Sequence, residues 1–394
     1  MVDFAWAWAG SQATSILALL GAEVIKIESR RRIDHSRVFS LTTGQWFDEP
    51  DRSSIFNDMN LGKLSANIDI SHPEGVKLVK ELVAISDVVA QNMRPGKMEA
   101  LGLGYEVLRK IKPDIIMLSS SARGTTGPER EYIGYAPLFS AISGFAYVSG
   151  YEGEDPIRLS GEIDLLSATS SAFAILAALI HRQRTGEGQF IDLSSTEATS
   201  VFMGEVFMDY FMNGRNQTRH GNKDSFMAPH NVYRCTGDDK WVSIAVASDE
   251  EFRTLCEVAG HPEWAIDERF ADSFTRWHNQ EALDELIGSW TIKQTHTKVM
   301  KMLQAVGVAA TPSCNSEDLW NDPHLRERDF WTEVDHPILG KKTVIAPVWK
   351  FSETPLEIGA PAPLFGQHNK YVFGDLLGLD DAQIERLVAE QVIY

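Results

Sequence analysis

The chain has 394 residues, of which 43% are hydrophobic and 23% charged, and its formal net charge is −18. This length exceeds that of one compact core and predicts two domains, while the composition is that of an ordinary globular protein. The negative charge, together with the lack of an apolar run long enough to cross a bilayer, argues against a nucleic acid or a membrane as partner.

The first third of the chain alternates between short apolar runs and helical patterns. The patterns predict a strand at Val2 to Trp6, a turn at Ala9 to Ser11, a helix at Ala13 to Leu20 and a strand at Glu23 to Glu28. Further strands are predicted at residues 65–70, 87–90 and 115–119, with helices around residues 75–85 and before Lys112. This alternation predicts a parallel sheet that is covered on both faces.

The middle and the end of the chain have a different character. An Ala-rich and Leu-rich run from Ser167 to Ile180 predicts a buried helix, with a basic last turn and a glycine stop before Gly188. After about Asn213, short strands such as residues 241–247 and polar helices predict a smaller α+β domain. Pro355, Pro361 and Pro363 predict an extended connector, and residues 380–391 a final helix.

Asp164 stands directly before the predicted buried helix. Its side chain is either a plain helix cap or an accessible carboxylate nucleophile, because small neighbours leave it open and backbone amides would lie near it. The residues alone leave both interpretations open. The chain shows no nucleophile elbow, P-loop or metal-ligand cluster that would compete with it.

Other polar features are less specific. Glu28 stands where a ribose-binding acid would be, but the first βα turn has a single glycine, Gly10, which disfavours a dinucleotide site. The basic run Arg30, Arg31, Arg32 and Arg37 is either a solvated loop or a phosphate site. The three cysteines, Cys235, Cys256 and Cys314, lack the spacing of a disulfide framework or a zinc site, and together with the absence of a signal peptide they predict a cytoplasmic protein.

A series of short motifs occurs in a defined order along nearly the whole chain. They are Asp3-Phe4 with Trp8-Ala9-Gly10, Leu20 to Glu28, Asn60 with Lys63, Gln91 to Gly96, Leu101 to Tyr105, Gly124 to Pro128, Asp164 before Ile175 to Leu179, Arg184 to Gln189, Ala228 to Arg234, Gly307 to Ala309, Asp322 to His324 and Gly366 to Asn369. Taken together they resemble the class III CoA-transferases, the family of formyl-CoA, carnitine and benzylsuccinate CoA-transferases and of 2-methylacyl-CoA racemase.

The resemblance implies a fold. The family has an open, mostly parallel Rossmann-like α/β sheet domain built from both chain ends, a smaller α+β middle domain, and two subunits that interlock as a dimer. Residues 1–200 are then the first part of the large CoA-binding domain, residues 213–320 the small domain, and residues 325–394 the return linker with the C-terminal part of the large domain. Some members are heteromers, in which this chain would be the Asp-bearing subunit.

The resemblance also implies a reaction. In the family the aspartate before the Ala-Ala-Leu helix is the nucleophile, and Asp164 takes that place. CoA would pass from an acyl-CoA donor, such as succinyl-CoA, to a carboxylic acid through a mixed anhydride and an aspartyl-CoA thioester, with no metal and no tightly bound cofactor. The residues expected to contact CoA are Trp8, Ala9, Arg30, Ile68, Asn92, Met93 and Arg94, with Ser29 at the family's arginine position. Trp46 and Tyr135 are expected at the acyl pocket.

Departures from the family pattern narrow the reaction. The racemases need a histidine shortly before Ser143-Gly144-Phe145, where this chain has Tyr135. The stretch Gly221 to Met227 replaces the glycine-rich lid of formyl-CoA transferase, which disfavours formyl or oxalyl transfer.

Three points stay open. The aromatic cluster of Trp6, Trp8 and Trp46 with Phe4 and Phe47 favours an aromatic or dicarboxylic acceptor that resembles benzylsuccinate. The alternatives are a racemase and a non-catalytic subunit. The chain starts almost on its first strand, without the family's short leader, which predicts a misassigned start codon or a first strand contributed differently.

Overall fold

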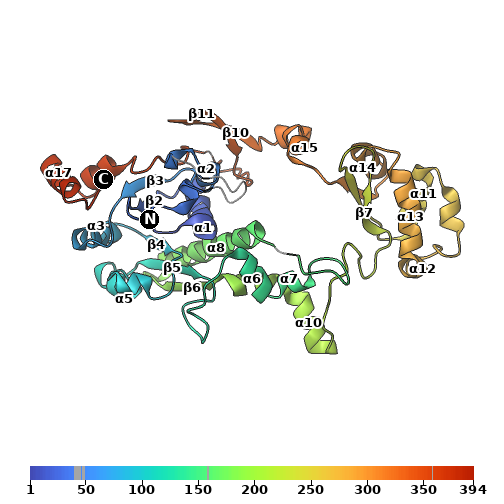
Figure 1. Ribbon diagram of the computed structural model, residues 1–394, viewed down its shortest axis with the longest axis horizontal. Coiled ribbons are helices and arrows are strands. Elements are labelled where there is room, and N and C mark those ends of the chain that lie inside the picture. Colours follow the sequence, from blue (N-terminus) through green and yellow to red (C-terminus); the bar gives the residue numbers. More distant parts are fainter. Residues whose placement is uncertain (40–45, 47–48, 158, 357) are drawn as a thin grey trace. The chain divides into compact units, whose positions relative to one another are not determined.

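The computed structural model describes residues 1–39, 46, 49–157, 159–356 and 358–394. These residues form two compact units, which are considered separately. The larger unit comprises Met1–Ala146, Arg158–Asn216 and Arg326–Tyr394, and the smaller one Tyr147–Ile157 and Gln217–Leu325. The larger unit is therefore built from both ends of the chain, drawn in blue to green and in red in Figure 1.

The sheet of the larger unit has six parallel strands in the order β3-β2-β1-β4-β5-β6. The strands are β1 (Val2–Asp3), β2 (Ile25–Glu28), β3 (Leu64–Asn67), β4 (Val88–Gln91), β5 (Ile116–Ser121) and β6 (Phe190–Ser194). The predicted α/β class with a parallel sheet is confirmed. Because the strand order reverses between β1 and β4, the carboxyl ends of these two strands flank the crevice where ligands of open α/β sheets bind.

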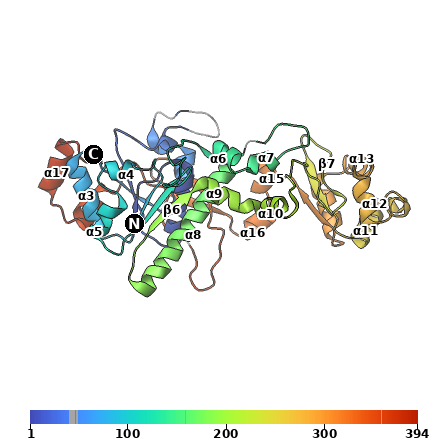
Figure 2. The same ribbon diagram turned by 90° about the horizontal axis from the view of Figure 1, so that it is seen from below.

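Both faces of this sheet are covered, because successive side chains of a strand point to opposite sides. In β5, Ile116 and Leu118 pack with Leu17 and Ile175 in one core, whereas Met117 belongs to another. The first face is covered by α1 (Ala7–Leu19) and α8 (Gly161–Thr185). The second is covered by α3 (Pro73–Ala84), α5 (Tyr105–Ile111), the π-helix η5 (Tyr371–Leu376) and α17 (Asp381–Ala389), as Figures 1 and 2 show.

Helix α8 corrects one statement made from the sequence. It is long and apolar enough to cross a membrane by length and composition, so the statement that no apolar run approaches this length is wrong. The helix extends beyond the predicted residues 167–180 at both ends, and its serines and threonines do not interrupt the apolar stretch. Its buried residues, among them Ile163, Ala168 and Ile175, face the protein and pack near α1 and β5. These contacts make α8 a core helix.

The remaining elements before the smaller unit's sheet, and the hairpin after it, are short. They are η1 (His35–Arg37), η2 (Pro50–Arg52), α2 (Ser54–Met59), α4 (Lys97–Ala100), α6 (Ala136–Ile142), α7 (Phe145–Val148), α9 (Ser195–Ser200), η3 (Val201–Met203), α10 (Gly204–Asn213) and the hairpin of β10 (Trp331–His336) with β11 (Gly340–Ile345).

The returning C-terminal segment covers the edge of the sheet at β3. The Ser65 N–H donates to His368 Nδ1 at 3.1 Å, and the Asn67 N–H donates to Asn369 Oδ1 at 2.8 Å. Just beyond the strand, the Asp69 N–H donates to the Val392 carbonyl at 2.8 Å. These bonds satisfy backbone groups that an open edge strand would expose.

Arg37 ties the same segment to the N-terminal half of the unit. Its fully buried guanidinium donates to both oxygens of Glu28 and, at 2.6 Å, to Asp51. It also donates to the Pro363 carbonyl at 3.2 Å and lies 3.5 Å from the centre of the Phe56 ring. Arg37 is therefore committed to the fold, which leaves it out of any phosphate site formed by the basic run.

The smaller unit has an antiparallel sheet in the order β7-β8-β9, formed by β7 (His230–Arg234), β8 (Trp241–Ala245) and β9 (Ala309–Pro312). Its helices are α11 (Asp249–Ala259), η4 (Pro262–Ile266), α12 (Ser273–His278), α13 (Gln280–Thr291), α14 (His296–Gln304) and α15 (Ser316–Trp320), and α16 (Pro323–Glu327) leads out of it. The core gathers around Phe252, Leu283 and Val299. The predicted α+β character after residue 213 agrees with these elements.

Candidate active site

The turn between β1 and α1 lies at Ala5 and Trp6, because α1 already begins at Ala7. The sequence prediction of a turn at Ala9 to Ser11 is therefore wrong. Ala7 has a positive φ of 49°, which is uncommon for a residue with a Cβ atom. Hydropathy patterns did not reveal this turn, because polar side chains from distant parts of the chain hold it.

Asn92, at the end of β4, fixes Trp6 from one side. Its Oδ1 accepts from the Trp6 N–H at 2.9 Å, and its Nδ2 donates to the Trp6 carbonyl at 2.8 Å. A Cβ atom on Gly10 would lie 2.9 Å from Asn92 Cγ and 2.6 Å from the Ala5 Cβ. The single glycine of the first turn is thus required by close packing of this clamp rather than by a pyrophosphate.

Two charged residues fix the turn from the other side. Lys26 Nζ donates to the Ala5 carbonyl at 2.6 Å, and the Asp34 carboxylate accepts from the Ala7 N–H at 3.3 Å. The two side chains form an ion pair at 2.9 Å and are fully buried. The bonds from Lys26 and to Asp34 restrict the conformation of the turn, and both charges stay buried.

Asp164 lies within the first turn of α8. The helix begins at Gly161 after the N-cap residue Ser160, so Asp164 stands inside the helix and not directly before it, and of the two interpretations left open by the sequence the helix cap is excluded. The Asp164 carboxyl group instead lies near the Ala9 N–H of α1, and the interaction with this amide lowers the pKa of the carboxyl group. Trp8 packs over the start of α8, since a Cβ atom on Gly161 would lie 3.3 Å from its indole ring. The N-terminal ends of two helices therefore meet at Asp164.

Burial perturbs this carboxyl group. It raises the pKa of Asp164 from 3.8 to about 7, and the Ala9 N–H offsets the effect only in part. A carboxyl group of this kind is deprotonated by a modest rise in pH and is weakly solvated once ionised. Perturbed groups of this kind are frequent at catalytic sites.

The residues expected to contact CoA follow the carboxyl ends of neighbouring strands. They come after β1 (Trp8, Ala9), β2 (Arg30), β3 (Ile68) and β4 (Asn92, Met93, Arg94). Because parallel strands end at the same edge of a sheet, the structure places these positions along one edge, next to the order reversal. Asp164 lies near this edge, because its carboxyl group is close to the Ala9 N–H.

These residues differ in what they can offer a ligand. Arg30 and Arg94 are exposed, and the Arg30 guanidinium lies 5.2 Å from the centre of the Tyr394 ring. The Ile68 side chain is fully buried, and the Asn92 amide is committed to Trp6. Met93 packs against the sheet core. Ile68 therefore has no exposed surface with which to meet a ligand, whereas Asn92 is partly exposed although its amide is committed to Trp6.

The other basic residues near β2 have protein partners. Arg31 pairs with Asp69 at 3.2 Å, and the Arg32 guanidinium lies 4.9 Å from the centre of the Trp6 ring. Both side chains are exposed. Arg30 and Arg94 are thus the cations of this group with the most freedom to meet a phosphate.

The two residues expected at the acyl pocket are both exposed. Trp46 is 71% exposed with its ring 5.0 Å from that of Phe39, and Phe47 of the predicted aromatic cluster lies outside the described residues. Tyr135 is the N-cap residue of α6 and is 76% exposed. Their assignment to an acyl pocket stays a prediction.

Sequence reasoning missed the buried charges beneath the first turn. Besides Lys26 and Asp34, Lys63 Nζ lies 3.0 Å from Asp3, and this pair is also fully buried. Lys26 stands between two buried isoleucines in β2. A lysine in a parallel strand covered on both faces needs a buried partner, and that rule could have indicated the network.

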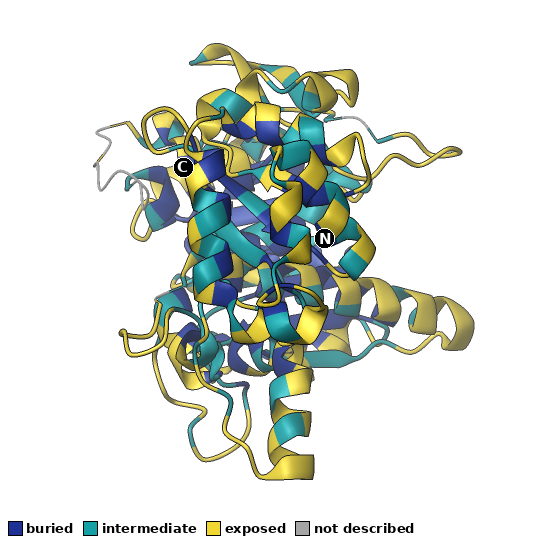
Figure 3. Ribbon diagram, turned by 90° about the vertical axis from the view of Figure 1, so that its right-hand side faces the viewer, coloured by how far each residue is buried: buried dark blue, intermediate teal, exposed yellow. Residues whose placement is uncertain are grey.

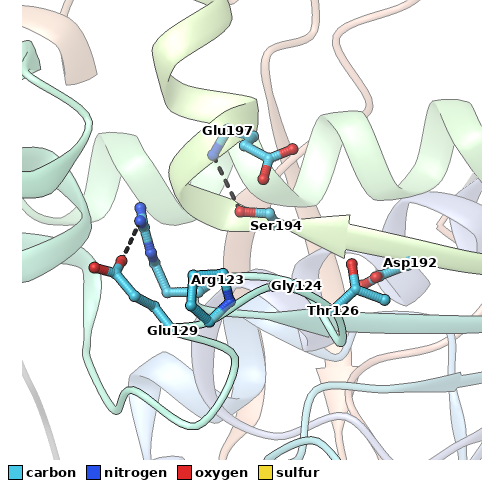
Figure 4. Close-up of a pocket in the computed structure, with 9 residues that line it drawn as sticks. Arg123, Gly124, Thr126, Glu129, Asp192, Ser194 and Glu197 are labelled. Carbon is cyan, nitrogen blue, oxygen red and sulfur yellow. Dashed lines mark hydrogen bonds and ion pairs between the residues drawn. The ribbon is translucent and has the colours of Figure 1, made fainter.

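A cavity of about 410 Å³ lies near the carboxyl ends of β5 and β6 (Figure 4). It is lined by Arg123, Gly124, Thr126, Gly127, Pro128, Glu129, Asp192, Ser194 and Glu197. The Thr125 N–H and hydroxyl donate to Asp192, which holds the glycine-rich loop in place. Arg123 donates to Glu129 across the rim. Within the part of the chain that the structure describes, no group of three or more His, Cys, Asp or Glu side chains could hold a metal ion.

Comparison with known proteins gives a consistent picture. The model of the family described as CoA-transferase family III matches residues 1–369. Succinyl-CoA--D-citramalate CoA-transferase from Chloroflexus aurantiacus is 35% identical over 98% of this chain and 94% of its own length. The beta subunit of succinyl-CoA--L-malate CoA-transferase from the same organism is 32% identical over 100% of this chain and 96% of its own length.

The fold has a matching solved structure. A CaiB/BaiF family protein from Brucella suis superposes with a TM-score of 0.86 at 29% identity, covering 95% of this chain and 97% of that one. The six-stranded parallel sheet and the small antiparallel sheets are thus those of a known architecture.

Proposed function

The chain belongs to CoA-transferase family III, and on this premise we propose that it moves CoA from succinyl-CoA to an aliphatic dicarboxylic acid, with Asp164 as the nucleophile. Membership makes it a CoA-transferase, whose CoA thioesters are substrates rather than bound cofactors. The names of two relatives support the finer assignment, since one acts on D-citramalate and the other on L-malate, both with succinyl-CoA.

The observation that carries the role of Asp164 is its contact with α1. The carboxylate meets the Ala9 N–H at the edge of the sheet where the expected CoA-contacting residues lie. Because its pKa is near neutrality, the group is available as a carboxylate at neutral pH. Because it is largely buried, little water has to be removed before the carboxylate attacks a thioester. Tyr135 stands where a racemase would have histidine, so transfer is the reaction that the residues favour.

The proposed reaction has two matched halves. The Asp164 carboxylate attacks the thioester carbonyl of succinyl-CoA and the C–S bond breaks. This step forms a mixed anhydride between Asp164 and succinate and releases CoA as its thiolate. The thiolate then attacks the Asp164 carbonyl, which releases succinate and leaves an aspartyl-CoA thioester. The acceptor carboxylate attacks this thioester to form a second anhydride, and the thiolate attacks the acceptor carbonyl, which restores Asp164.

The Ala9 N–H suits this cycle. Each half-reaction begins or ends with an Asp164 carboxylate, and a fixed amide donor stabilises the charge of that group. The donor belongs to a helix of thirteen residues, α1, so its position does not depend on a mobile loop. Exclusion of water preserves the thioester energy through the anhydride steps.

The function is tested by trapping the covalent intermediate. The purified chain is incubated with a panel of acyl-CoAs, treated with hydroxylamine or borohydride, and analysed by peptide mass spectrometry. Succinyl-CoA is expected to give a hydroxamate or a reduced residue at Asp164, and acetyl-CoA far less. Acceptors are ranked by formation of their CoA esters, with malate, citramalate and glutarate ahead of benzoate. Modification elsewhere, or none with any donor, would contradict the proposed nucleophile.

We also propose that the active form is a dimer. Exposed apolar side chains on α8 (Leu165, Phe173, Leu176, Ile180) share one helical face, and others lie on α10 (Phe207, Met208, Phe211, Met212). Exposed positions of this kind are yellow in Figure 3. Apolar faces of this extent support a protein partner. The family resemblance suggests a second, interlocked copy, whereas the malate transferase named above has subunits that differ.

The oligomer is tested by light scattering on the chain purified alone. A homodimer is expected at twice the chain mass, and Phe173→Glu should shift it to monomer, because a charge on this face cannot be buried without a partner. The control Lys77→Gln lowers the net charge by the same amount at an exposed position of α3 and should leave the dimer intact. A monomeric parent chain would instead support a heteromer with a homologous subunit.

The compartment is a further part of the proposal. The family consists of soluble enzymes, and α8 is a core helix despite its apolar composition. We place the enzyme in the cytoplasm, in agreement with the expectation from the cysteines.

A further inference from the structure

We propose that Asp34 is a positioning residue for the reaction: it fixes the first turn of α1 so that the Ala9 N–H is aimed at Asp164. The inference rests on the proposed role of Asp164 as nucleophile. Asp34 itself is fully buried and does not meet the substrate, so it acts through the backbone of the turn.

Side chains from distant parts of the chain hold the two residues of the turn, Ala5 and Trp6, and the residue that follows it, Ala7. Asn92 binds both polar backbone atoms of Trp6, and Lys26 binds the Ala5 carbonyl. Asp34 accepts the Ala7 N–H with both of its oxygens at 3.3 Å. Asp34 is thus the side chain that fixes Ala7, the residue after the turn and the first residue of α1.

Ala7 is the point in the turn that needs an outside constraint. Its φ of 49° lies in the left-handed region, which side chains with a Cβ atom rarely adopt. The hydrogen bond from its N–H to Asp34 favours this conformation over the ordinary alternatives. Because Ala9 follows within the same helical turn, the direction of the Ala9 N–H depends on the conformation at Ala7.

The Asp34 carboxylate is in turn held firmly. Ser36 donates to it from its N–H at 3.0 Å and from its hydroxyl at 2.7 Å, and Lys26 Nζ lies 2.9 Å away. A buried ion pair of this kind contributes little net stability compared with an apolar pair of the same size. The pair instead provides an acceptor for the Ala7 N–H, which an apolar pair could not do.

The test uses two double variants that both remove the buried charges, so neither leaves an unpaired ion. Lys26→Met with Asp34→Leu removes the acceptor for the Ala7 N–H, whereas Lys26→Met with Asp34→Asn keeps an amide oxygen in its place. We measure the rate of Asp164 thioester formation from succinyl-CoA in a single turnover, the affinity for CoA, and amide hydrogen exchange in a peptide that covers the first turn of α1.

The Leu variant is expected to form the thioester about ten- to a hundredfold more slowly, because a displaced donor misaligns the reacting groups. Its CoA affinity should stay near that of the parent, and its first-turn amides should exchange faster. The Asn variant should restore most of the rate and the protection. Equal rates in both variants, whether both fast or both slow, would overturn the proposal.

The outcome separates this inference from the proposed function. A parent chain that forms no thioester at Asp164 with any donor refutes the nucleophile, whereas the exchange measurement still decides whether Asp34 fixes the turn. If the Leu variant protects the first-turn amides as well as the Asn variant does, Asp34 has no positioning role.

Discussion

Asp164→Asn is expected to lower the rate of CoA transfer by about 10⁴-fold or more, because an asparagine amide does not attack a thioester. Asparagine has nearly the same size, and its Oδ1 can still accept the Ala9 N–H. The variant should therefore fold and bind CoA. The rate of exchange between succinyl-CoA and a labelled acid, measured on both proteins, checks this expectation.

Glu162→Gln is the matched control. Glu162 lies in the same helical turn, and its carboxylate accepts from the Ser160 N–H at the surface. Its replacement removes the same charge two residues away and should leave the rate near that of the parent. Comparable losses in the two variants would mean that the rate responds to charge at the start of α8 and not to a nucleophile at Asp164.

The raised pKa of Asp164 adds a signature in pH. Below about pH 7 the carboxyl group of the free enzyme is protonated and cannot attack, so kcat/KM should fall as the pH decreases through this region. The Asp164→Asn residual activity should lack this limb. A flat profile between pH 5 and pH 8 for the parent would show that burial does not hold the proton on this group.

The same shift predicts an effect on stability. The folded-state pKa of about 7 exceeds the ordinary value of 3.8, so the folded chain holds an extra proton between these values and loses stability as pH rises through about 7. The upper bound of this loss is about 4 kcal/mol, and solvent at the partly exposed carboxylate reduces it to roughly 1–2 kcal/mol. Asp164→Asn should therefore melt higher than the parent at pH 8, with the difference disappearing near pH 4.

Arg37→Ala has the largest expected effect on stability, a loss of about 3–5 kcal/mol in the free energy of unfolding. It leaves the buried Glu28 carboxylate without its cation and breaks the bonds to Asp51 and Pro363. Arg37→Lys should recover part of this loss at most, because an ammonium group cannot bind a carboxylate with two parallel bonds. Urea unfolding followed by tryptophan fluorescence measures the change.

The control for Arg37 is the exposed pair of Arg52 and Glu49. These side chains approach to 2.5 Å, yet both are about half exposed. Arg52→Ala should cost less than about 1 kcal/mol, as is usual for surface ion pairs. Similar losses for Arg52 and Arg37 would indicate that charge near η2, and not the buried network, stabilises this region.

The regular part of the larger unit could be predicted from hydropathy patterns. The strand and helix periods at residues 23–28, 75–85 and 115–119 reflect side chains that pack directly on the sheet, so pattern and structure coincide at β2, α3 and β5. The returning segment could not be predicted in this way. Its bonds from His368 and Asn369 to β3 join residues about three hundred positions apart, and no local pattern encodes them.

The starts of α1 and α8 show why the site was harder to predict. Gly10 suggested a turn, but it lies inside α1. A glycine is needed there because a side chain would collide with Asn92 and Ala5. Asp164 left a helix cap open as one interpretation, but it lies within the first turn of α8 and is close to an amide of another helix. In both cases a tertiary contact outweighs the local preference of the residue.

The candidate nucleophile was reached through family resemblance, not through residue chemistry. An aspartate near the start of an apolar helix has no distinctive local signal, and its raised pKa arises from the folded surroundings. The Lys26 and Asp34 pair is different, because a lysine within a buried strand demands a partner. That demand is readable in the sequence, although the identity of the partner is not.

The covering of β3 by the returning segment also affects how the protein is made. While a ribosome is synthesising the chain, residues 1–216 can emerge and collapse around β1 to β6, but the hydrogen-bonding groups of Ser65 and Asn67 find their partners only after residues 368 and 369 have left the exit tunnel. Until then the nascent sheet carries an unpaired strand at its margin, and the Gln217–Leu325 part of the smaller unit is translated in the interval. A chaperone that shields this margin would protect the newborn enzyme during that delay.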